Sequence, residues 1–312
     1  MARVITWLTH KWIPCWNFTE TDAAYLARLT PGVDIRICWS ENDFLRELPT
    51  AAAALVWRFE QAYFAQAPNL RHIATPAAGK DYFHIDPPPR VTVSYGTFHG
   101  PLMAETVVGM ALAHCRGIIE TRRLSGETWP RAEVGRTMRS LRGARVTVLG
   151  LGHIGEWIAR LLKPFGVTLT GVRRTAPDQR PPFFDEKDQI IPLSGLDAVL
   201  PTTDHLILCL PRSPETNHII NASRLAGLPG HAALYNVGRG NAVDEAALAA
   251  ALRAGKLAGA YLDVFETEPL PMDSPLRGCP NAFLMPHVSA VSPDYMRLFC
   301  DEVSTRLPGN HA

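Results

Sequence analysis

The sequence lacks several features that would place it in a specialised class of protein. No window of about 18 apolar residues occurs, so we expect no membrane-spanning helix. The N-terminus has no apolar run followed by a small-residue cleavage site, which predicts no signal peptide and a cytoplasmic location. The cysteines form no C-x-x-C pair and no tight cluster with histidine, which argues against a disulfide framework or a structural metal site. They are Cys15, Cys38, Cys115, Cys209, Cys279 and Cys300.

The sequence also lacks an excess of charge of either sign. It has 31 Lys and Arg against 30 Asp and Glu, a formal net charge of +1. This balance excludes a strongly basic nucleic-acid binder and a protein with an acidic tail. Apolar residues make up 46% and charged residues 20% of the 312 residues, which is the composition of a globular protein. The length corresponds to roughly two domains.

Short apolar runs alternate with helix-like segments over the first hundred residues. The apolar runs predict strands, and the segments between them have helical character. Such alternation is typical of a small parallel α/β unit. We predict strands at 4–8, 33–38, 53–57, 70–74 and 91–93, and helices at 20–29, 41–48 and 61–67.

A second α/β series follows a long helix predicted from 102 to 120. The fold class is therefore α/β, with two Rossmann-like or flavodoxin-like lobes built on doubly wound parallel sheets. We expect a nucleotide-binding domain (100–287) inserted into a substrate domain that is formed by 1–99 and completed by 288–312. In the second series we predict helices at 152–165 and 245–254 and strands at 145–149, 167–172, 205–210, 232–237, 259–264 and 282–285.

The strand at 145–149 is followed by a glycine-rich sequence, Gly150-Leu151-Gly152-His153-Ile154-Gly155. This G-x-G-x-x-G motif between a strand and a helix is typical of dinucleotide-binding folds. The first glycine makes a tight turn, the second lets the backbone approach a pyrophosphate, and the third lets helix and strand pack closely. The N–H groups at the helix start then bind the phosphate. The alternative is a glycine-rich turn that binds no ligand.

The end of the next predicted strand indicates which dinucleotide binds. An acidic side chain there binds the ribose 2′-hydroxyl of NAD, but this sequence has Arg173, Arg174 and Thr175. A carboxylate repels a 2′-phosphate, whereas a guanidinium makes paired hydrogen bonds with it. The sequence therefore predicts NADPH as the preferred cofactor, with NADH as an alternative. The simpler interpretation is that both arginines are solvated turn residues.

Arg239, Glu268 and His287 each follow one of the last three predicted strands. Ligands of open α/β sheets bind at the carboxyl ends of the strands, so these three side chains can converge on one crevice. Taken singly, each has a simpler explanation, as a loop charge, a surface glutamate before proline and a polar strand-end histidine. Their order behind a dinucleotide-binding motif favours a shared catalytic site.

These segments resemble the D-isomer-specific 2-hydroxyacid dehydrogenase family. The resemblance rests on the glycine motif, on 236–240 (NVGRG), 262–270 (LDVFETEPL) and 285–288 (MPHV), and on the earlier loop 77–81 (AAGKD). Within the family the sequence is most similar to the glyoxylate/hydroxypyruvate reductases, as the run 54–57 (ALVW) and the chain length indicate. The resemblance implies an oxidoreductase with a nicotinamide cofactor.

The resemblance also implies roles for the three strand-end residues. Arg239 would bind the substrate carboxylate and polarise the keto oxygen. His287, as an imidazolium, would donate a proton to that oxygen while hydride arrives from the nicotinamide. Glu268 would hydrogen-bond the other ring nitrogen and raise the pKa of the histidine.

Further ligand contacts follow by the same resemblance. Ala78 and Gly79 would present backbone N–H groups to the substrate carboxylate, and Trp57 and Arg58 would lie over the substrate. The alternative for the last two is a core tryptophan and a surface arginine. Other residues would line the cofactor: Leu210, Pro211 and Thr216 along the adenosine and pyrophosphate, and Val237, Gly238 and Asp263 at the nicotinamide carboxamide.

The leading hypothesis is a reductase that converts a small 2-keto acid, of the glyoxylate or hydroxypyruvate type, to the D-2-hydroxy acid with NADPH. One alternative is a non-catalytic protein that senses dinucleotides through this fold, and another is a biosynthetic reductase of a larger 2-keto acid. By resemblance, the region 103–129 predicts a homodimer surface with C₂ symmetry. We expect no metal, no nucleic-acid partner and no membrane partner.

Overall fold

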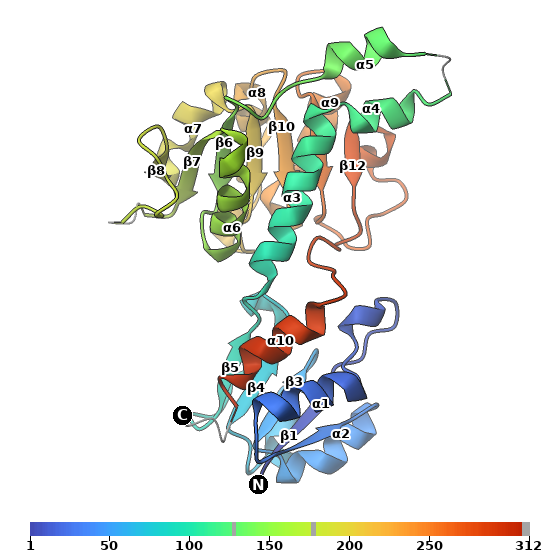
Figure 1. Cartoon of the computed structure of the whole chain (residues 1–312), viewed down its shortest axis with the longest axis vertical. Helices are drawn as coiled ribbons and strands as arrows, with labels where there is room; N and C mark the ends of the chain where they lie inside the picture. Colours follow the sequence, from blue (N-terminus) through green and yellow to red (C-terminus); the bar gives the residue numbers. More distant parts are fainter. Residues whose placement is uncertain (127–128, 176–178, 308–312) are drawn as a thin grey trace. The chain divides into compact units, whose positions relative to one another are not determined.

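The computed structural model describes residues 1–126, 129–175 and 179–307, and the chain separates into two compact units (Figure 1). Unit 1 comprises Met1–His99 and Ala290–Ala312, and unit 2 comprises Gly100–Ser289. Unit 2 is therefore an insertion between the two parts of unit 1. Residues 308–312, the end of the segment expected to complete the first domain, lie outside the described part of the chain.

Unit 1 contains a five-stranded sheet with the strand order β2-β1-β3-β4-β5, and every strand pair in it is parallel. The central strand β3 is buried along its whole length, which is why its sequence is continuously apolar rather than alternating. The strands are β1 (Ala2–Trp7), β2 (Val33–Ile37), β3 (Ala53–Val56), β4 (His72–Thr75) and β5 (Thr92–Tyr95).

Three α-helices belong to the described part of unit 1: α1 (Glu20–Leu29), α2 (Glu41–Glu47) and α10 (Tyr295–Ser304). Helix α1 begins with a capping box, in which Thr19 and Asp22 satisfy each other's backbone N–H groups. Helix α10 packs against α1, and the Tyr25 hydroxyl donates a hydrogen bond to Asp301 at 2.5 Å. The C-terminal segment is thereby fixed to the N-terminal lobe (Figure 1).

Unit 2 contains a seven-stranded sheet with the order β12-β11-β10-β9-β6-β7-β8, again parallel throughout. The chain runs outward from β6 through β7 to β8 and then returns to β9 on the other side. The point between β6 and β9 is the topological switch where open α/β sheets bind ligands. The strands are β6 (Arg145–Leu149), β7 (Thr168–Arg173), β8 (Gln189–Pro192), β9 (His205–Leu208), β10 (Ala233–Asn236), β11 (Gly259–Leu262) and β12 (Ala282–Leu284).

Helices cover the sheet of unit 2, with α3 and α6 lying in front of it in Figure 1. Leucines of α8 and α9 pack into the main apolar cluster of this unit, and each fully buried leucine contributes roughly 1.5–3 kcal/mol. The helices are α3 (His99–Cys115), α4 (Ile118–Arg123), α5 (Arg131–Thr137), α6 (His153–Leu162), α7 (Leu196–Val199), α8 (Ala222–Gly227) and α9 (Glu245–Arg253).

The structure confirms the predicted fold class and corrects three local details. The long helix expected over 102–120 begins at His99 and breaks before α4, because Gly117 has a φ of +62°, which ends a helix. The segment expected as a helix over 61–67 is a 3₁₀ helix, Gln61–Gln66, whose buried aromatic residues are fixed by core packing. Strand β8 follows a polar, proline-rich stretch, and no strand was predicted there.

Short 3₁₀ helices connect the main elements. In unit 1 they are Pro14–Trp16, Leu48–Thr50, Gln61–Gln66 and Lys80–Tyr82, and in unit 2 Lys163–Phe165, Leu193–Gly195, Leu200–Thr202, Pro214–Thr216, Gly240–Ala242 and Pro275–Gly278. Within the ranges that the structure describes, no helix combines the length and apolarity needed to cross a bilayer. Nor do three metal-ligating side chains gather anywhere among these residues.

Candidate active site

Three neighbouring strands of unit 2 carry the predicted catalytic residues at their carboxyl ends. Strands β10, β11 and β12 are adjacent in the sheet, and the loops after them contain Arg239, Glu268 and His287 in that order. Because the strands are parallel, all three loops emerge at the same edge of the sheet. The structure therefore brings these three loops together within one compact unit.

The loop that carries Arg239 is shaped by Asn236, the last residue of β10, which is 1% exposed. Its side-chain amide donates to the carbonyl of Arg239 at 3.0 Å, and its oxygen accepts from the Gly238 N–H at 3.1 Å. At Gly240 a Cβ atom would lie 1.8 Å from the carbonyl carbon of Phe265. Only glycine lets this loop pass so close to the segment after β11.

Glu268 and His287 form a direct pair. The Nδ1–H of His287 donates to Oε2 of Glu268 at 2.7 Å, and Oε1 accepts from the backbone N–H of Phe265 at 3.0 Å. Both carboxylate oxygens are thus engaged, one by the main chain and one by the imidazole. This fixes the ring and leaves Nε2 as the nitrogen that can face a substrate.

Asp263 holds the turn on which His287 lies. It is completely buried, and its two oxygens accept from the N–H groups of Val288 at 2.7 Å and Ser289 at 2.9 Å. Its carbonyl accepts from the N–H of His287 at 2.9 Å. His287 has a φ of +54°, a left-handed conformation that residues other than glycine seldom adopt. Asp263 is therefore a positioning residue here, while its contact with a carboxamide stays a prediction.

The pair is poised for proton transfer. The hydrogen bond to Glu268 raises the pKa of His287 above its ordinary value of 6.5, against the opposing effect of burial. Burial acts to raise the pKa of Glu268, but hydrogen bonds from His287 and a backbone amide outweigh it and lower that pKa. The positive charge of Arg239 acts on both groups, which places it within electrostatic reach of the pair. Both shifts stabilise the imidazolium beside the carboxylate relative to the isolated groups.

The glycine motif at the switch point fits a dinucleotide pyrophosphate. Gly150 has a φ of +97°, and a Cβ there would lie 2.7 Å from the carbonyl oxygen of Cys209. A Cβ on Gly155 would lie 2.4 Å from the carbonyl oxygen of Gly150, so the helix approaches the strand closely. At Gly152, by contrast, nothing lies within 4 Å, and no side chain caps the start of α6. Open space beside uncapped helix N–H groups suits a phosphate.

The predicted residues at the end of β7 differ in their surroundings. Arg173 donates to the carbonyl of Leu151 and pairs with the carboxylate of Glu156. Arg174 and Thr175 are exposed. A hydrogen bond from Ser213 and, more weakly, the charge of Arg174 lower the pKa of Glu215, which places Arg174 near the loop after β9.

That loop contains the predicted cofactor-lining residues Leu210, Pro211 and Thr216. The Thr216 hydroxyl donates to the carbonyl of Pro211 at 2.8 Å, so this side chain shapes the loop. A Cβ on Gly238 would lie 2.6 Å from the nitrogen of Leu210, which shows that the loops after β9 and β10 touch. Val237 is buried beside them.

The predicted substrate residues Trp57, Arg58, Ala78 and Gly79 lie in unit 1, after β3 and β4. The Trp57 indole N–H donates to the carbonyl of Trp16 at 3.0 Å. Arg58 pairs with Glu41 at 2.8 Å and lies over the ring of Trp7, so it is engaged within its own unit. Among the described residues, the N–H groups of Ala78 and Gly79 donate to no partner, as a carboxylate-binding loop requires. A role for these four residues in substrate binding remains a prediction.

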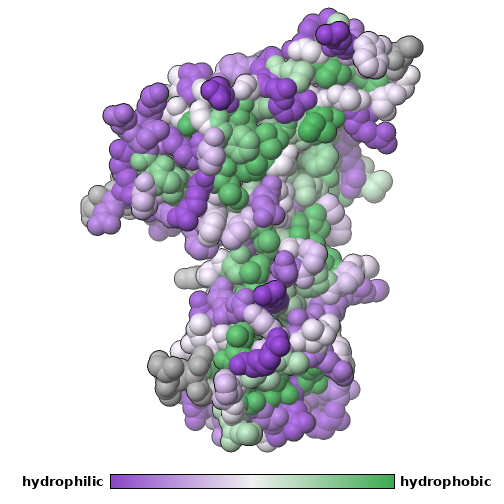
Figure 2. All heavy atoms as spheres, in the orientation of Figure 1, coloured by the Kyte–Doolittle hydropathy of each residue, from purple (hydrophilic) through white to green (hydrophobic). Residues whose placement is uncertain are grey.

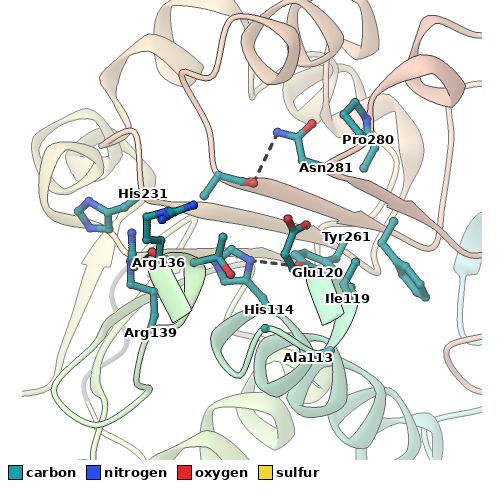
Figure 3. Close-up of a pocket in the computed structure, with 15 residues that line it drawn as sticks. Ala113, His114, Ile119, Glu120, Arg136, Arg139, His231, Tyr261, Pro280 and Asn281 are labelled. Atoms are coloured by element: carbon teal, nitrogen blue, oxygen red, sulfur yellow. Dashed lines mark hydrogen bonds between the residues drawn. The ribbon is translucent and has the colours of Figure 1, made fainter. Parts of the chain in front are cut away.

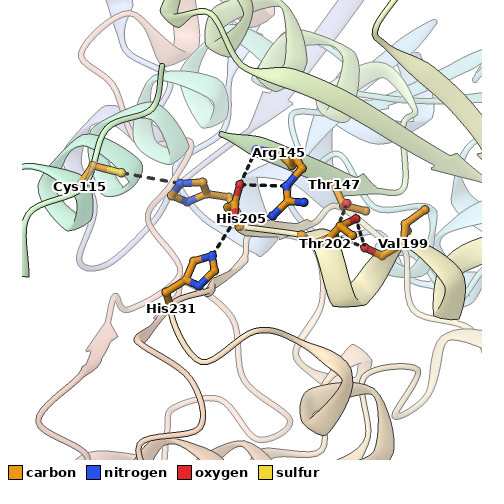
Figure 4. A network of polar contacts seen from close by, with 9 residues as sticks. Cys115, Arg145, Thr147, Val199, Thr202, His205 and His231 are labelled. Carbon is orange, nitrogen blue, oxygen red and sulfur yellow. Dashed lines mark hydrogen bonds and ion pairs between the residues drawn. The ribbon is translucent and has the colours of Figure 1, made fainter. Parts of the chain in front are cut away.

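A second polar region lies at the opposite, amino-terminal edge of the same sheet. A cavity of about 330 Å³ opens there, with His114, Arg136, Arg139 and His231 among its lining residues (Figure 3). Behind it, His205 is linked to Tyr235 at 2.9 Å. His205 is also linked to Cys115 at 3.7 Å, and His231 pairs with Asp204 at 2.8 Å (Figure 4). Sequence reasoning did not find this network, because its members are scattered along the chain.

Comparison with known proteins identifies the family. Residues 108–289 match the model of the D-isomer specific 2-hydroxyacid dehydrogenase NAD binding domain. The chain belongs to this family. It is 31% identical to glyoxylate/hydroxypyruvate reductase B of Serratia proteamaculans over 264 residues, which is 80% of this chain and 78% of that protein. The family assignment confirms the resemblance that the motifs predicted, and the protein is an NAD(P)-dependent oxidoreductase.

Solved structures of the family have the same two-unit fold. A D-isomer specific 2-hydroxyacid dehydrogenase from Xanthobacter autotrophicus, in complex with NADPH and MES, is 32% identical with a TM-score of 0.79 and covers 98% of this chain and 94% of its own. An NADPH-dependent glyoxylate/hydroxypyruvate reductase from Sinorhizobium meliloti, in complex with NADP and sulfate, is 28% identical with a TM-score of 0.77. The match covers 100% of this chain and 98% of that one.

Proposed function

We propose that this protein reduces a small 2-keto acid of the glyoxylate or hydroxypyruvate type to the D-2-hydroxy acid, with NADPH preferred over NADH. The observation that carries the proposal is the pair of His287 and Glu268 at 2.7 Å, with Arg239 within electrostatic reach. The named relatives act on or bind the same classes of molecule, namely glyoxylate, hydroxypyruvate and NADPH.

Each residue of the site has a step that its chemistry suits. The guanidinium of Arg239 binds the substrate carboxylate and polarises the keto oxygen. His287, held protonated by Glu268, donates the proton at Nε2 to that oxygen as it gains negative charge. When bound, the nicotinamide supplies the hydride for the keto carbon. In the reverse direction neutral His287 accepts the hydroxyl proton.

The two units take different parts in this proposal. Unit 2 holds the cofactor through Gly150, Gly152 and Gly155, with His153 and Ile154 at the helix start. The N–H groups of Ala78 and Gly79 in unit 1 remain predicted partners of a substrate carboxylate, and among the described residues they donate to no acceptor. The exposed side chain of Arg174 supports the preference for NADPH, because a guanidinium matches a 2′-phosphate.

The decisive test is a set of initial rates with glyoxylate, hydroxypyruvate, pyruvate and phenylpyruvate, each against NADPH and NADH. We expect turnover of the two smallest substrates and a higher kcat/KM with NADPH. Absence of turnover with every keto acid would favour a dinucleotide-sensing protein instead. A preference for phenylpyruvate would indicate a reductase of larger 2-keto acids, and a kcat/KM for NADH equal to that for NADPH would refute the cofactor assignment.

We also propose that the face of unit 2 around α3 is a dimer surface. Figure 2 shows apolar side chains gathered over this face, and Ile118 and Trp129 beyond the helix are 57% and 81% exposed. Of the region 103–129 predicted from the sequence, residues 127 and 128 lie outside the described chain. Sedimentation should give a dimer that Ile118→Glu weakens, and a wild-type monomer would remove this proposal without affecting the catalytic one.

A further inference from the structure

The guanidinium of Arg173 is engaged inside the glycine-loop element of unit 2. Its Nε–H donates to the carbonyl of Leu151, between the first two glycines of the motif, and its Nη2–H donates to the carboxylate of Glu156. Glu156 lies in the first turn of α6. The Arg173 and Glu156 side chains are 29% and 41% exposed. The ion pair therefore links the end of β7 to the start of the helix that follows the glycines.

Because of this contact, the adjacent residues Arg173 and Arg174 attract an anion to different extents. The charge of Arg173 is balanced at short range by a carboxylate, so its attraction for a further anion is reduced. Arg174 is exposed at the end of the same strand, forms no ion pair with a described carboxylate, and acts only weakly on the nearby Glu215. Arg174 is therefore the stronger attractor for a phosphate at this position.

We propose that Glu156 is a specificity-determining residue for the cofactor, and that its carboxylate weakens the preference for a 2′-phosphorylated dinucleotide. The inference rests on the proposed function, in which the adenosine ribose lies at the end of β7. Two effects act together: the 2′-phosphate has to share Arg173 with Glu156, and the carboxylate repels the phosphate directly. NADH has no phosphate there, so neither effect applies to it.

The test measures cofactor binding without any keto acid, by titrating the protein with NADPH and with NADH and following cofactor fluorescence. Glu156→Gln keeps the size of the side chain and removes its charge. We expect the Kd for NADPH to fall about 3- to 5-fold, the effect of releasing a partly exposed ion pair, and the Kd for NADH to change less than about 2-fold. In an Arg173→Gln background, Glu156→Gln should give a smaller gain for NADPH, because only the direct repulsion is then relieved.

The matched control is Glu133→Gln, which removes one negative charge from an exposed ion pair with Arg136 in the same unit. It should leave both dissociation constants unchanged, which separates the local effect from a change in net charge. Unchanged or weaker NADPH binding by Glu156→Gln, or an equal gain for both cofactors, would overturn the inference. Because no keto acid is present, lack of turnover in the rate assay would refute the proposed function without deciding this result.

Discussion

Unit 2 carries histidines at both edges of its seven-stranded sheet, and the two edges shift their pKa values in opposite directions. At the carboxyl edge the hydrogen bond to Glu268 raises the pKa of His287. At the amino edge burial lowers the pKa of His114 and of His205 to about 4. The sheet, the residue type and the unit are the same, so the difference lies in the immediate surroundings.

The partner of each imidazole decides which form is favoured. His287 faces a carboxylate, whose charge stabilises the imidazolium. His114 and His205 face the neutral hydroxyls of Tyr261 and Tyr235, at 3.0 and 2.9 Å, which do not repay the cost of burying a charge. Of these three histidines, only His287 has surroundings that favour the imidazolium. The proposed reaction site therefore rests on the charge arrangement at the carboxyl edge and not on the cavity at the amino edge.

Replacing His287 should have the largest effect on the rate of reduction. His287→Gln removes the proposed proton donor, and kcat for keto-acid reduction should fall about 10²- to 10⁴-fold. His231→Gln, in the network at the amino edge, should leave kcat unchanged. Steady-state kinetics of the two variants test whether His287 is the proton donor. Full kcat in His287→Gln would refute this role.

Arg239→Lys tests the other cation of the carboxyl edge. Lysine keeps the charge but lacks the planar fork that pairs with a carboxylate. We expect kcat/KM for the keto acid to fall about 10- to 100-fold, as the loss of a charged hydrogen bond implies. The Kd of NADPH, measured without substrate, should stay the same. An equal loss in cofactor affinity would point to misfolding of the loop after β10.

Glu268→Gln gives His287 a neutral partner, like the partners of His114 and His205 at the amino edge. This variant tests whether the charge of Glu268 sets the pKa of His287. In the proposed mechanism reduction requires the protonated ring, so kcat of the wild type should fall as the pH rises through the raised pKa of His287. In the variant that fall should occur at lower pH, because the carboxylate that stabilises the imidazolium is gone. A pH–rate profile with an unshifted limb would contradict the assigned role of Glu268.

His205→Phe gives the smallest catalytic effect and a clear effect on stability. Removing the ring nitrogens leaves the buried Tyr235 hydroxyl without its partner, which should lower the free energy of unfolding by about 1–3 kcal/mol. His205 is neutral when folded but takes up a proton on unfolding, so the wild type should lose stability as the pH falls from 6.5 towards 4.

That loss should be smaller in His205→Phe, and denaturant titrations at several pH values measure it. The kcat at neutral pH should match the wild type. A marked drop in kcat would show that the two edges of the sheet are functionally coupled, contrary to the comparison.

Much of the fold and site could be predicted from local patterns. The glycine motif between a strand and a helix predicts the first βα unit, and β6 has the bounds that its apolar run indicates. Strand β8 was missed because only its two central isoleucines form an apolar run, between Gln189 and Pro192 and beside a proline-rich stretch. The ion pair of Arg173 with Glu156 was missed as well, since 17 residues separate the partners and no periodicity connects them.

The sequence by itself determined the family, the α/β class and the identity of the three strand-end residues, because these depend on local motifs in a set order. Only the tertiary structure decided how those residues are held. Asp263 fixes the backbone around His287, Asn236 fixes the loop of Arg239, and Glu268 controls the protonation of the ring. Burial and a partner within hydrogen-bond distance set such properties, and both arise only when segments far apart in the chain come together.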